Sequence, residues 1–168
     1  MKDISRLPGV HSLSGARISP GGSLESIHRI RELFREYADA TGACECFSGF
    51  AKEIAGLPGP YSPPGGQLLL AELEGSSAGC VALRKLDEGI CEMKRLYVRP
   101  AFRGRHLGRH LAEAILSEAR RIGYRAMRLD TLSTMMAAQA LYQSLGFRPI
   151  PRYNDHPGPG VIHLELEL

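Results

Sequence analysis

The segment from Ile90 to Gly123 constrains the fold more than any other stretch of this sequence. It reads ICEMKRLYVRPAFRGRHLGRHLAEAILSEARRIG, a strand-like run, a short turn at Pro100 and then a long amphipathic segment. Apolar residues recur at helical spacing from about His106 to Ile122, and Gly123 is a typical helix stop. A strand joined so directly to a long helix indicates a fold that mixes both elements.

The N-terminal half adds a first strand, two helices and two further strands to this unit. Ser23 can cap a helix in which apolar residues recur at helical spacing through Tyr37, and a shorter helix is expected from Gly49 to Leu57. The turn-rich run PGPYSPPGG follows, and then QLLLAELEG and AGCVALRKL read as strands that precede the strand at Ile90. Three consecutive strands predict an antiparallel meander.

The C-terminal part supplies the remaining elements. AMRLDTL reads as a strand, residues 134–145 as a helix that ends at Gly146, and FRPIP with VIHLELEL as a final hairpin. The predicted order is strand, helix, helix, three strands, helix, strand, helix, two strands, which is an α+β fold with a mixed central β-sheet flanked by helices. We expect a flexible arm at residues 1–15 and one domain at residues 16–168.

Composition narrows the classes of partner. With 168 residues, 43% hydrophobic and 23% charged, and no apolar run of membrane-spanning length, the chain is typical of a soluble globular protein. The net charge of +3 does not indicate a nucleic-acid-coating protein, and the N-terminus lacks a signal-peptide pattern, so we expect a cytoplasmic location. Cys44, Cys46, Cys80 and Cys91 form no zinc or disulfide pattern, and no metal site is predicted.

The sequence RGRHLG, residues 103–108, lies where the strand meets the helix. Main-chain N–H groups in a first helical turn have no partners within the helix and, with the positive end of the helix dipole, form a site for phosphate or pyrophosphate. Arg103 and Arg105 can strengthen such a site, and Gly104 and Gly108 keep side chains away from the ligand. The run fits neither a Walker loop nor the dinucleotide-binding fingerprint.

Two motifs, in this order, resemble the GNAT superfamily of acyl-CoA N-acyltransferases. The family's pyrophosphate loop is written Q/R-x-x-G-x-G/A, and residues 103–108 fit it except that His106 replaces the inner glycine. The later family motif, a helix with A-x-x-L-Y that ends in L-G-F, is matched by Ala138, Leu141, Tyr142, Leu145, Gly146 and Phe147. The resemblance covers nearly the whole chain from Ala16 and implies the GNAT fold with its splayed central strands.

The resemblance implies that acetyl-CoA is the cosubstrate and indicates where coenzyme A binds. Main-chain groups of Leu96, Tyr97 and Val98 would pair with the pantetheine arm, in a cleft where this strand and AMRLDTL splay apart. The pyrophosphate would lie on the loop formed by Arg103, Gly104, Arg105, His106, Leu107 and Gly108. We expect His106 to adopt an ordinary helical φ and still offer its N–H to phosphate. Met135 stands where the family usually has an asparagine, and a methionine cannot donate an amide hydrogen bond.

Two residues are the predicted catalytic groups. Tyr142 matches the tyrosine that many family members use as the general acid toward the departing thiolate. Glu92 lies on the strand that would carry the cosubstrate and is the predicted base, because an amine acceptor is mostly protonated at neutral pH and must lose a proton. The alternatives are a rim or core tyrosine, and a glutamate that pairs with Lys94 or Arg95.

The acceptor site is predicted opposite the coenzyme arm. Its candidate residues come from the segment between the first two helices, the central strands and the last loop: Cys46, Phe47, Tyr61, Arg95, Asp130, Tyr153, Asn154 and Asp155. Arg95 would suit an acceptor with a carboxylate, whereas Asp130 and Asp155 would suit a polyamine or a lysine.

Three functions are compatible with this sequence. The first is an N-acetyltransferase that moves an acetyl group to the primary amine of a small molecule by direct attack in a ternary complex. Proline-rich loops that would close the acceptor pocket favour it. The second is acetylation of a protein lysine or N-terminus, which needs an open groove, and the third is a non-catalytic acyl-CoA-binding sensor. The alternating residues of VIHLELEL could also support a homodimer through an edge strand.

Overall fold

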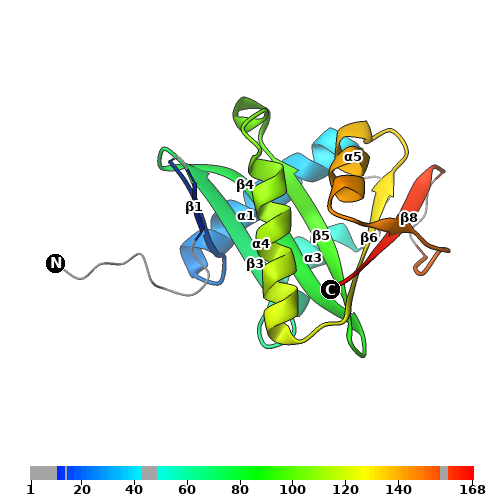
Figure 1. Ribbon diagram of the computed structural model, residues 1–168. Coiled ribbons are helices and arrows are strands. Elements are labelled where there is room, and N and C mark those ends of the chain that lie inside the picture. The colour runs from blue at the N-terminus through cyan, green and yellow to red at the C-terminus, as the bar shows by residue number, and fades with distance from the viewer. Residues whose placement is uncertain (1–10, 14, 43–48, 156–158) are drawn as a thin grey trace.

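A mixed eight-stranded sheet forms the centre of the computed structural model, which describes residues 11–13, 15–42, 49–155 and 159–168. The strands follow the order β1-β2-β3-β4-β5-β6-β8-β7 across the sheet (Figure 1). All neighbours are antiparallel except β5 and β6, which are parallel. The strands are β1 (His11–Leu13), β2 (Ala16–Pro20), β3 (Gln67–Leu73), β4 (Ser76–Asp87), β5 (Ile90–Val98), β6 (Ala126–Leu132), β7 (Arg148–Pro149) and β8 (Val161–Glu167).

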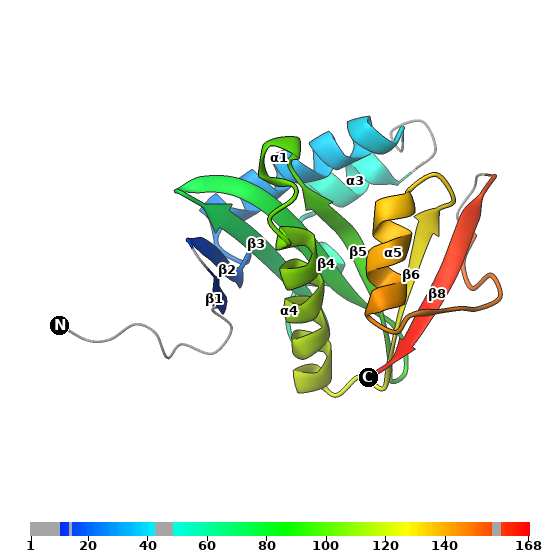
Figure 2. The same cartoon turned by 45° about the horizontal axis from the view of Figure 1, so that its top comes forward.

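Helices cover both faces of the sheet. Figure 2 shows α4 (Leu107–Ile122) and α5 (Met136–Ser144) on one face, and α1 (Leu24–Thr41) with α3 (Phe50–Ala55) on the other. Two short 3₁₀ helices, η1 (Gly59–Tyr61) and η2 (Pro100–Phe102), lie in the connections before β3 and after β5. Each face therefore has its own apolar core, one packed on α4 and one on α1 and α3.

The local signals behave as the sequence predicts. Ser23 caps α1, because its Oγ accepts a hydrogen bond from the Ser26 N–H at 3.1 Å. Gly123 ends α4 in the left-handed conformation, and its N–H donates to the Ala119 carbonyl. Cys80 and Cys91 are buried and free, as expected for small apolar residues in strands. The predicted α+β order is confirmed, with β1 as an additional short strand.

The two central parallel strands separate along their length. β5 and β6 pair only at Ile90 with Ala126, Cys91 with Met127 and Glu92 with Arg128. Beyond this rung β5 continues to Val98 and β6 to Leu132 without pairing to each other. The splayed strands implied by the family resemblance are thus present, and beyond Glu92 and Arg128 the main-chain groups of the two strands do not bond to each other.

A β-bulge lies in the separated half of β5. Cys80 of β4 is opposite Tyr97, and Ala82 is opposite Lys94, so Arg95 and Leu96 together face a single residue of β4. Arg95 has φ 57°, in the left-handed region that costs an L-residue about 1–2 kcal/mol. The surrounding structure must therefore hold Arg95 in this conformation.

The first described strand, β1, and the C-terminal strand, β8, lie toward opposite edges of the sheet. Within the predicted arm, residues 11–13 form β1 and pair with β2, and residues 1–10 and 14 lie outside the described residues. At the other edge, β7 pairs with β8 only at Leu164 and Glu165. In the described part of the chain, no helix is long and apolar enough to cross a membrane.

Candidate active site

A cleft of about 660 Å³ opens at the place where β5 and β6 diverge. Its walls are Leu96, Tyr97 and Val98 of β5, the end of α1 at Tyr37, Ala40 and Thr41, the start of α4 at Gly108, and residues around α5 from Leu132 to Tyr142. The structure therefore brings the predicted coenzyme-binding strand, part of the predicted pyrophosphate loop and the predicted acid into one cavity.

The turn before α4 presents unpaired main-chain amides. Gly104 has φ 78° and His106 has φ 58°, and the first main-chain bond into the helix is donated by the His110 N–H to the His106 carbonyl at 3.1 Å. Among the described residues, no hydrogen bond is donated by the main-chain N–H groups of residues 104–109. These amides, at the positive end of a 16-residue helix, suit an anionic phosphate.

The expectation of an ordinary helical φ for His106 is wrong. His106 is the N-cap of α4 in the left-handed conformation and makes no side-chain capping bond. The reason is the path of the chain, which passes from η2 to α4 through two residues with left-handed φ, Gly104 and His106. The glycine that the family usually has at this position would adopt such a φ without strain.

Gly108 leaves space in the cleft. A Cβ added there would meet Val98 Cγ2 at 3.8 Å and Leu141 Cδ2 at 3.9 Å, which are ordinary van der Waals distances. The protein itself would therefore tolerate a methyl group at position 108. Close packing within the chain does not require a glycine at position 108, and its missing side chain leaves room at the cleft that it lines.

Three of the basic residues between Lys94 and Arg109 lie near the end of β5 and the turn before α4. Arg99 binds the Glu36 carboxylate at 2.7 Å and the Ser77 carbonyl at 2.8 Å, so it joins β5 to α1 and β4. Around the turn, Arg103 donates from Nε to the Val98 carbonyl at 3.1 Å, and the exposed Arg105 lies 3.8 Å from Glu74. Arg103 and Arg105 therefore contribute positive charge near the unpaired amides.

Tyr142 lies on α5 and lines the cleft. Its side chain is buried, and its ring packs edge-on against Phe147 with centroids 5.7 Å apart. Burial, with smaller contributions from Tyr37 and Asp130, raises the pKa of the phenol. A phenol with a raised pKa stays protonated at neutral pH, which is the state that a general acid needs.

Glu92 lies at the last closed rung between β5 and β6 and is completely buried. Arg84 Nε donates to its Oε2 at 2.6 Å, and the Tyr153 hydroxyl donates to its Oε1 at 2.9 Å. Lys94 Nζ lies 3.7 Å away. Both carboxylate oxygens thus already accept a hydrogen bond, and the complete burial of Glu92 keeps an acceptor amine from direct contact with it in this arrangement. The base role stays a prediction.

A polar cluster joins three of the predicted acceptor residues. Lys94 Nζ lies 3.5 Å from both oxygens of Asp130, and the Asn154 side-chain amide donates to Asp130 Oδ2 at 2.7 Å. Tyr153 adds its bond to Glu92, with its ring beneath the Arg128 guanidinium at 5.5 Å. Asp130 is two residues beyond the last β5–β6 pair, so this cluster borders the opening between the strands.

Arg95 and Tyr61 belong to a second cluster. Both bind Glu53 of α3: Arg95 through Nε at 3.1 Å and a terminal nitrogen at 2.6 Å, Tyr61 through its hydroxyl at 2.6 Å. This bidentate pair does not favour the predicted contact of Arg95 with an acceptor carboxylate. Phe47 and Cys46 lie outside the described residues, and Asp155 lies 3.7 Å from Arg152 at the exposed surface.

Sequence reasoning missed Glu53, Arg84 and Tyr37. Glu53 and Arg84 bind predicted site residues that are 42 and 8 positions away, and no short motif connects such pairs. Tyr37 was identified only as an apolar position of the first helix, yet it lines the cleft. The helical spacing predicted its burial but carried no signal for a ligand.

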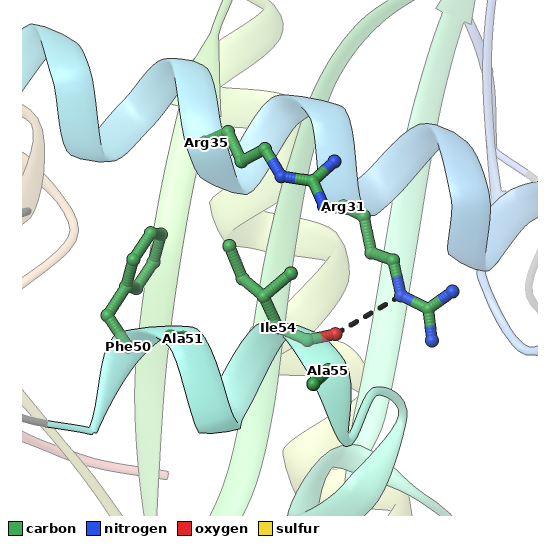
Figure 3. Close-up of a pocket in the computed structure, with 6 residues that line it drawn as sticks. All are labelled: Arg31, Arg35, Phe50, Ala51, Ile54 and Ala55. Carbon is green, nitrogen blue, oxygen red and sulfur yellow. Dashed lines mark hydrogen bonds between the residues drawn. The ribbon is translucent and has the colours of Figure 1, made fainter.

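A second hollow of about 540 Å³ lies between α1 and α3, away from the cleft. Figure 3 shows Phe50 and Ile54 of α3 pointing toward α1, with Arg31 and Arg35 above them. Arg31 Nε donates to the Ile54 carbonyl at 3.1 Å, so this contact holds the two helices together. Within the described ranges, no group of histidine, cysteine or acidic residues could hold a metal ion.

The family model described as acetyltransferase (GNAT) family matches residues 27–147. This chain belongs to the GNAT family. It is 38% identical to an uncharacterized N-acetyltransferase of Schizosaccharomyces pombe, over 86% of this chain and 90% of that protein. It is 32% identical to the N-acetylaspartate synthetase of Danio rerio, over 68% of this chain but only 42% of that protein.

Solved structures support the same fold. The PaiA N-acetyltransferase of Thermoplasma acidophilum, determined in complex with coenzyme A, superposes with a TM-score of 0.70 at 18% identity, over 91% of this chain and 99% of that one. The protein is therefore an acyl-CoA-dependent N-acyltransferase of the GNAT family, and acetyl-CoA is its cosubstrate. The non-catalytic sensor is no longer favoured.

Proposed function

We propose that this enzyme acetylates the primary amine of a small molecule. The observation that carries the proposal is the position of the segment after β7, which lies over the side of the sheet where the acceptor would bind. The segment that follows β7 is bonded to it at two points, Tyr153 to Glu92 and Asn154 to Asp130. A lysine side chain in a protein, or an extended N-terminus, needs an open groove on this side. A small amine needs no such groove.

The cleft residues have distinct roles in this proposal. The amides of residues 104–109 hold the pyrophosphate, with Arg103 and Arg105 beside them, and main-chain groups of Leu96 to Val98 bind the pantetheine arm. Acetyl-CoA supplies the activated acetyl thioester. The amine nitrogen forms the bond to the acetyl carbon directly, without an acetylated enzyme, and Tyr142 donates its proton to the departing thiolate sulfur.

The acceptor amine must lose a proton before or during attack. Glu92 can take that proton through the Tyr153 hydroxyl, which already donates to Glu92 Oε1. In such a relay Tyr153 passes its own proton to Glu92 and takes one from the amine. Direct contact between Glu92 and the amine is less compatible with the complete burial of the carboxylate.

The name of the zebrafish relative guides the choice of acceptor. That protein is an N-acetylaspartate synthetase, and N-acetylaspartate is the product of acetylating the amine of aspartate. Lys94, Arg84 and Arg128 near the opening each pair with a carboxylate of the chain, and an acceptor that bears both an amine and a carboxylate could exchange with such ion pairs. We therefore place free amino acids, with aspartate first, at the head of the candidate acceptors.

The test is thiol release from acetyl-CoA against a panel of amines. The panel contains aspartate and other amino acids, polyamines, lysine-containing peptides and peptides with free N-termini. We expect at least one small amine to give a kcat/KM more than tenfold above every peptide. Turnover with peptides alone would replace the proposal with protein acetylation.

A further inference from the structure

Arg95 has a backbone conformation that is unfavourable for an arginine. Arg95 adopts φ 57° at the bulge in β5, where a glycine would be free of strain. A residue held in a sparsely populated conformation persists only when its surroundings fix it, and such residues gather at functional sites. The contacts of the Arg95 side chain identify what fixes it here.

The guanidinium of Arg95 is held from three sides. Two of its nitrogens bind the two oxygens of Glu53, at 3.1 and 2.6 Å. Its charge lies 5.2 Å from the ring centroid of Phe50 and 5.6 Å from that of Tyr37. The whole residue is only 6% exposed. We call this group, Arg95 with Glu53, Phe50 and Tyr37, the bulge clamp.

Glu53 is itself firmly positioned. Its Oε1 also accepts the Tyr61 hydroxyl at 2.6 Å. Burial alone would raise the pKa of Glu53, but the hydrogen bonds and charge of Arg95 lower it below the usual value, so the carboxylate stays ionised. The helix that carries Glu53 is tied to α1 through Ile54 and Arg31, as Figure 3 shows.

The bulge clamp lies next to the wall of the cleft. Arg95 immediately precedes Leu96, Tyr97 and Val98, which line the cleft on β5. Tyr37 belongs both to the clamp and to the cleft, and its ring meets Tyr97 edge-on at 6.3 Å. Main-chain groups beyond the bulge therefore depend on the Arg95 conformation for their direction.

We infer that Arg95 is a positioning residue for acetyl-CoA, holding the β5 bulge so that the main-chain groups of Leu96 to Val98 face the pantetheine arm. This inference rests on the proposed assignment of β5 to coenzyme binding. It replaces the acceptor contact that the sequence predicted for Arg95. Specificity for the acceptor amine then comes from the polar cluster that contains Lys94 and Asp130, and affinity for acetyl-CoA depends on the bulge clamp.

The main test compares acetyl-CoA affinity in two variants by calorimetric titration. Arg95→Gly permits φ 57° but removes the clamp, and we expect its Kd for acetyl-CoA to rise at least tenfold. Arg95→Lys keeps the charge without the bidentate fork and should show an intermediate rise. In steady state, KM for acetyl-CoA should increase much more than kcat falls. A Kd for Arg95→Gly within twofold of the unmodified protein would overturn the inference.

The matched control is Arg29→Met. Arg29 also joins a helix to a strand by an ion pair, from α1 to Glu72 of β3, but lies outside the cleft. We expect its acetyl-CoA Kd to stay within twofold. If Arg95→Gly does not fold, Glu53→Gln serves instead, and an unchanged acetyl-CoA Kd in that variant would also overturn the inference.

Hydrogen exchange separates this inference from the proposed function. Acetyl-CoA should slow amide exchange at residues 96–98 in the unmodified protein, and Arg95→Gly should lose that protection. If the unmodified protein shows no protection there, the assignment of β5 to coenzyme binding fails, and the role of Arg95 fails with it. If protection persists in Arg95→Gly, only the role of Arg95 fails.

Discussion

His106 offers a test of backbone conformation at a single residue. A left-handed L-residue is strained by about 1–2 kcal/mol, whereas glycine in a helix interior costs about 1 kcal/mol relative to alanine. With φ 58° at position 106, His106→Gly should be more stable than His106→Ala by about 1 kcal/mol. Urea unfolding of the two variants measures the difference. If position 106 had an ordinary helical φ, His106→Ala would be the more stable variant.

Tyr142 is the residue on which the chemistry depends. General acid catalysis contributes roughly 100- to 10,000-fold, so we expect Tyr142→Phe to lower kcat by at least about 100-fold. The Kd for acetyl-CoA should be unchanged, because the ring and its contact with Phe147 remain. Since burial raises the pKa of the phenol, kcat should show no loss from Tyr142 ionisation near pH 10. Equal turnover by the variant would remove Tyr142 as the acid.

The residues that were hardest to predict share one cause. The direction of the Arg95 side chain depends on a bulge in β5, and the partners of Glu92 depend on the register between β4 and β5. A shift of one residue in register turns every side chain to the other face of a sheet. Motif spacing therefore predicted the loop at residues 103–108 and Tyr142, but could not show that Arg95 and Glu92 already have buried partners.

At the scale of elements, the junction of β5 and α4 makes the cleft. Gly108→Ala should leave the fold intact or stabilise it by up to about 1 kcal/mol, because alanine favours a helix and the new methyl meets only ordinary contacts. The same methyl points toward the cleft wall formed by Val98 and Leu141, so we expect the Kd for acetyl-CoA to rise about tenfold. Thermal unfolding and acetyl-CoA titration of one preparation measure both effects. Unchanged affinity would exclude Gly108 from the coenzyme site.

The elements themselves were largely predictable because their signals are local. Ser23 before an apolar periodicity predicted α1, and Gly123 after another predicted the end of α4. The divergence of β5 and β6 came from the family resemblance, because no local signal sets where two distant strands stop pairing. The left-handed φ of His106 was missed because it depends on the path of the chain from η2 into α4.

For the whole molecule, buried tyrosines predict a loss of stability in alkali. Burial, with smaller contributions from nearby charges, raises the pKa of Tyr61 and Tyr142, so above about pH 10 the unfolded chain releases phenolic protons that the folded protein keeps. Below that pH the two tyrosines make their full contribution to the free energy of unfolding. Above it, the free energy of unfolding falls by about 1.4 kcal/mol per pH unit for each tyrosine. Urea unfolding between pH 9 and 11 should show this slope, and Tyr142→Phe should reduce it. A slope that the variant leaves unchanged would contradict the assignment.

The central claim is that acetyl-CoA occupies the cleft where β5 and β6 diverge, with its pyrophosphate on the amides that open α4. Hydrogen exchange with and without acetyl-CoA tests this claim most directly, because the amides of residues 104–109 have no partner among the described residues. We predict that acetyl-CoA slows exchange at residues 104–109 and 96–98. Unchanged exchange in both segments, with protection instead at the hollow between α1 and α3, would contradict the claim.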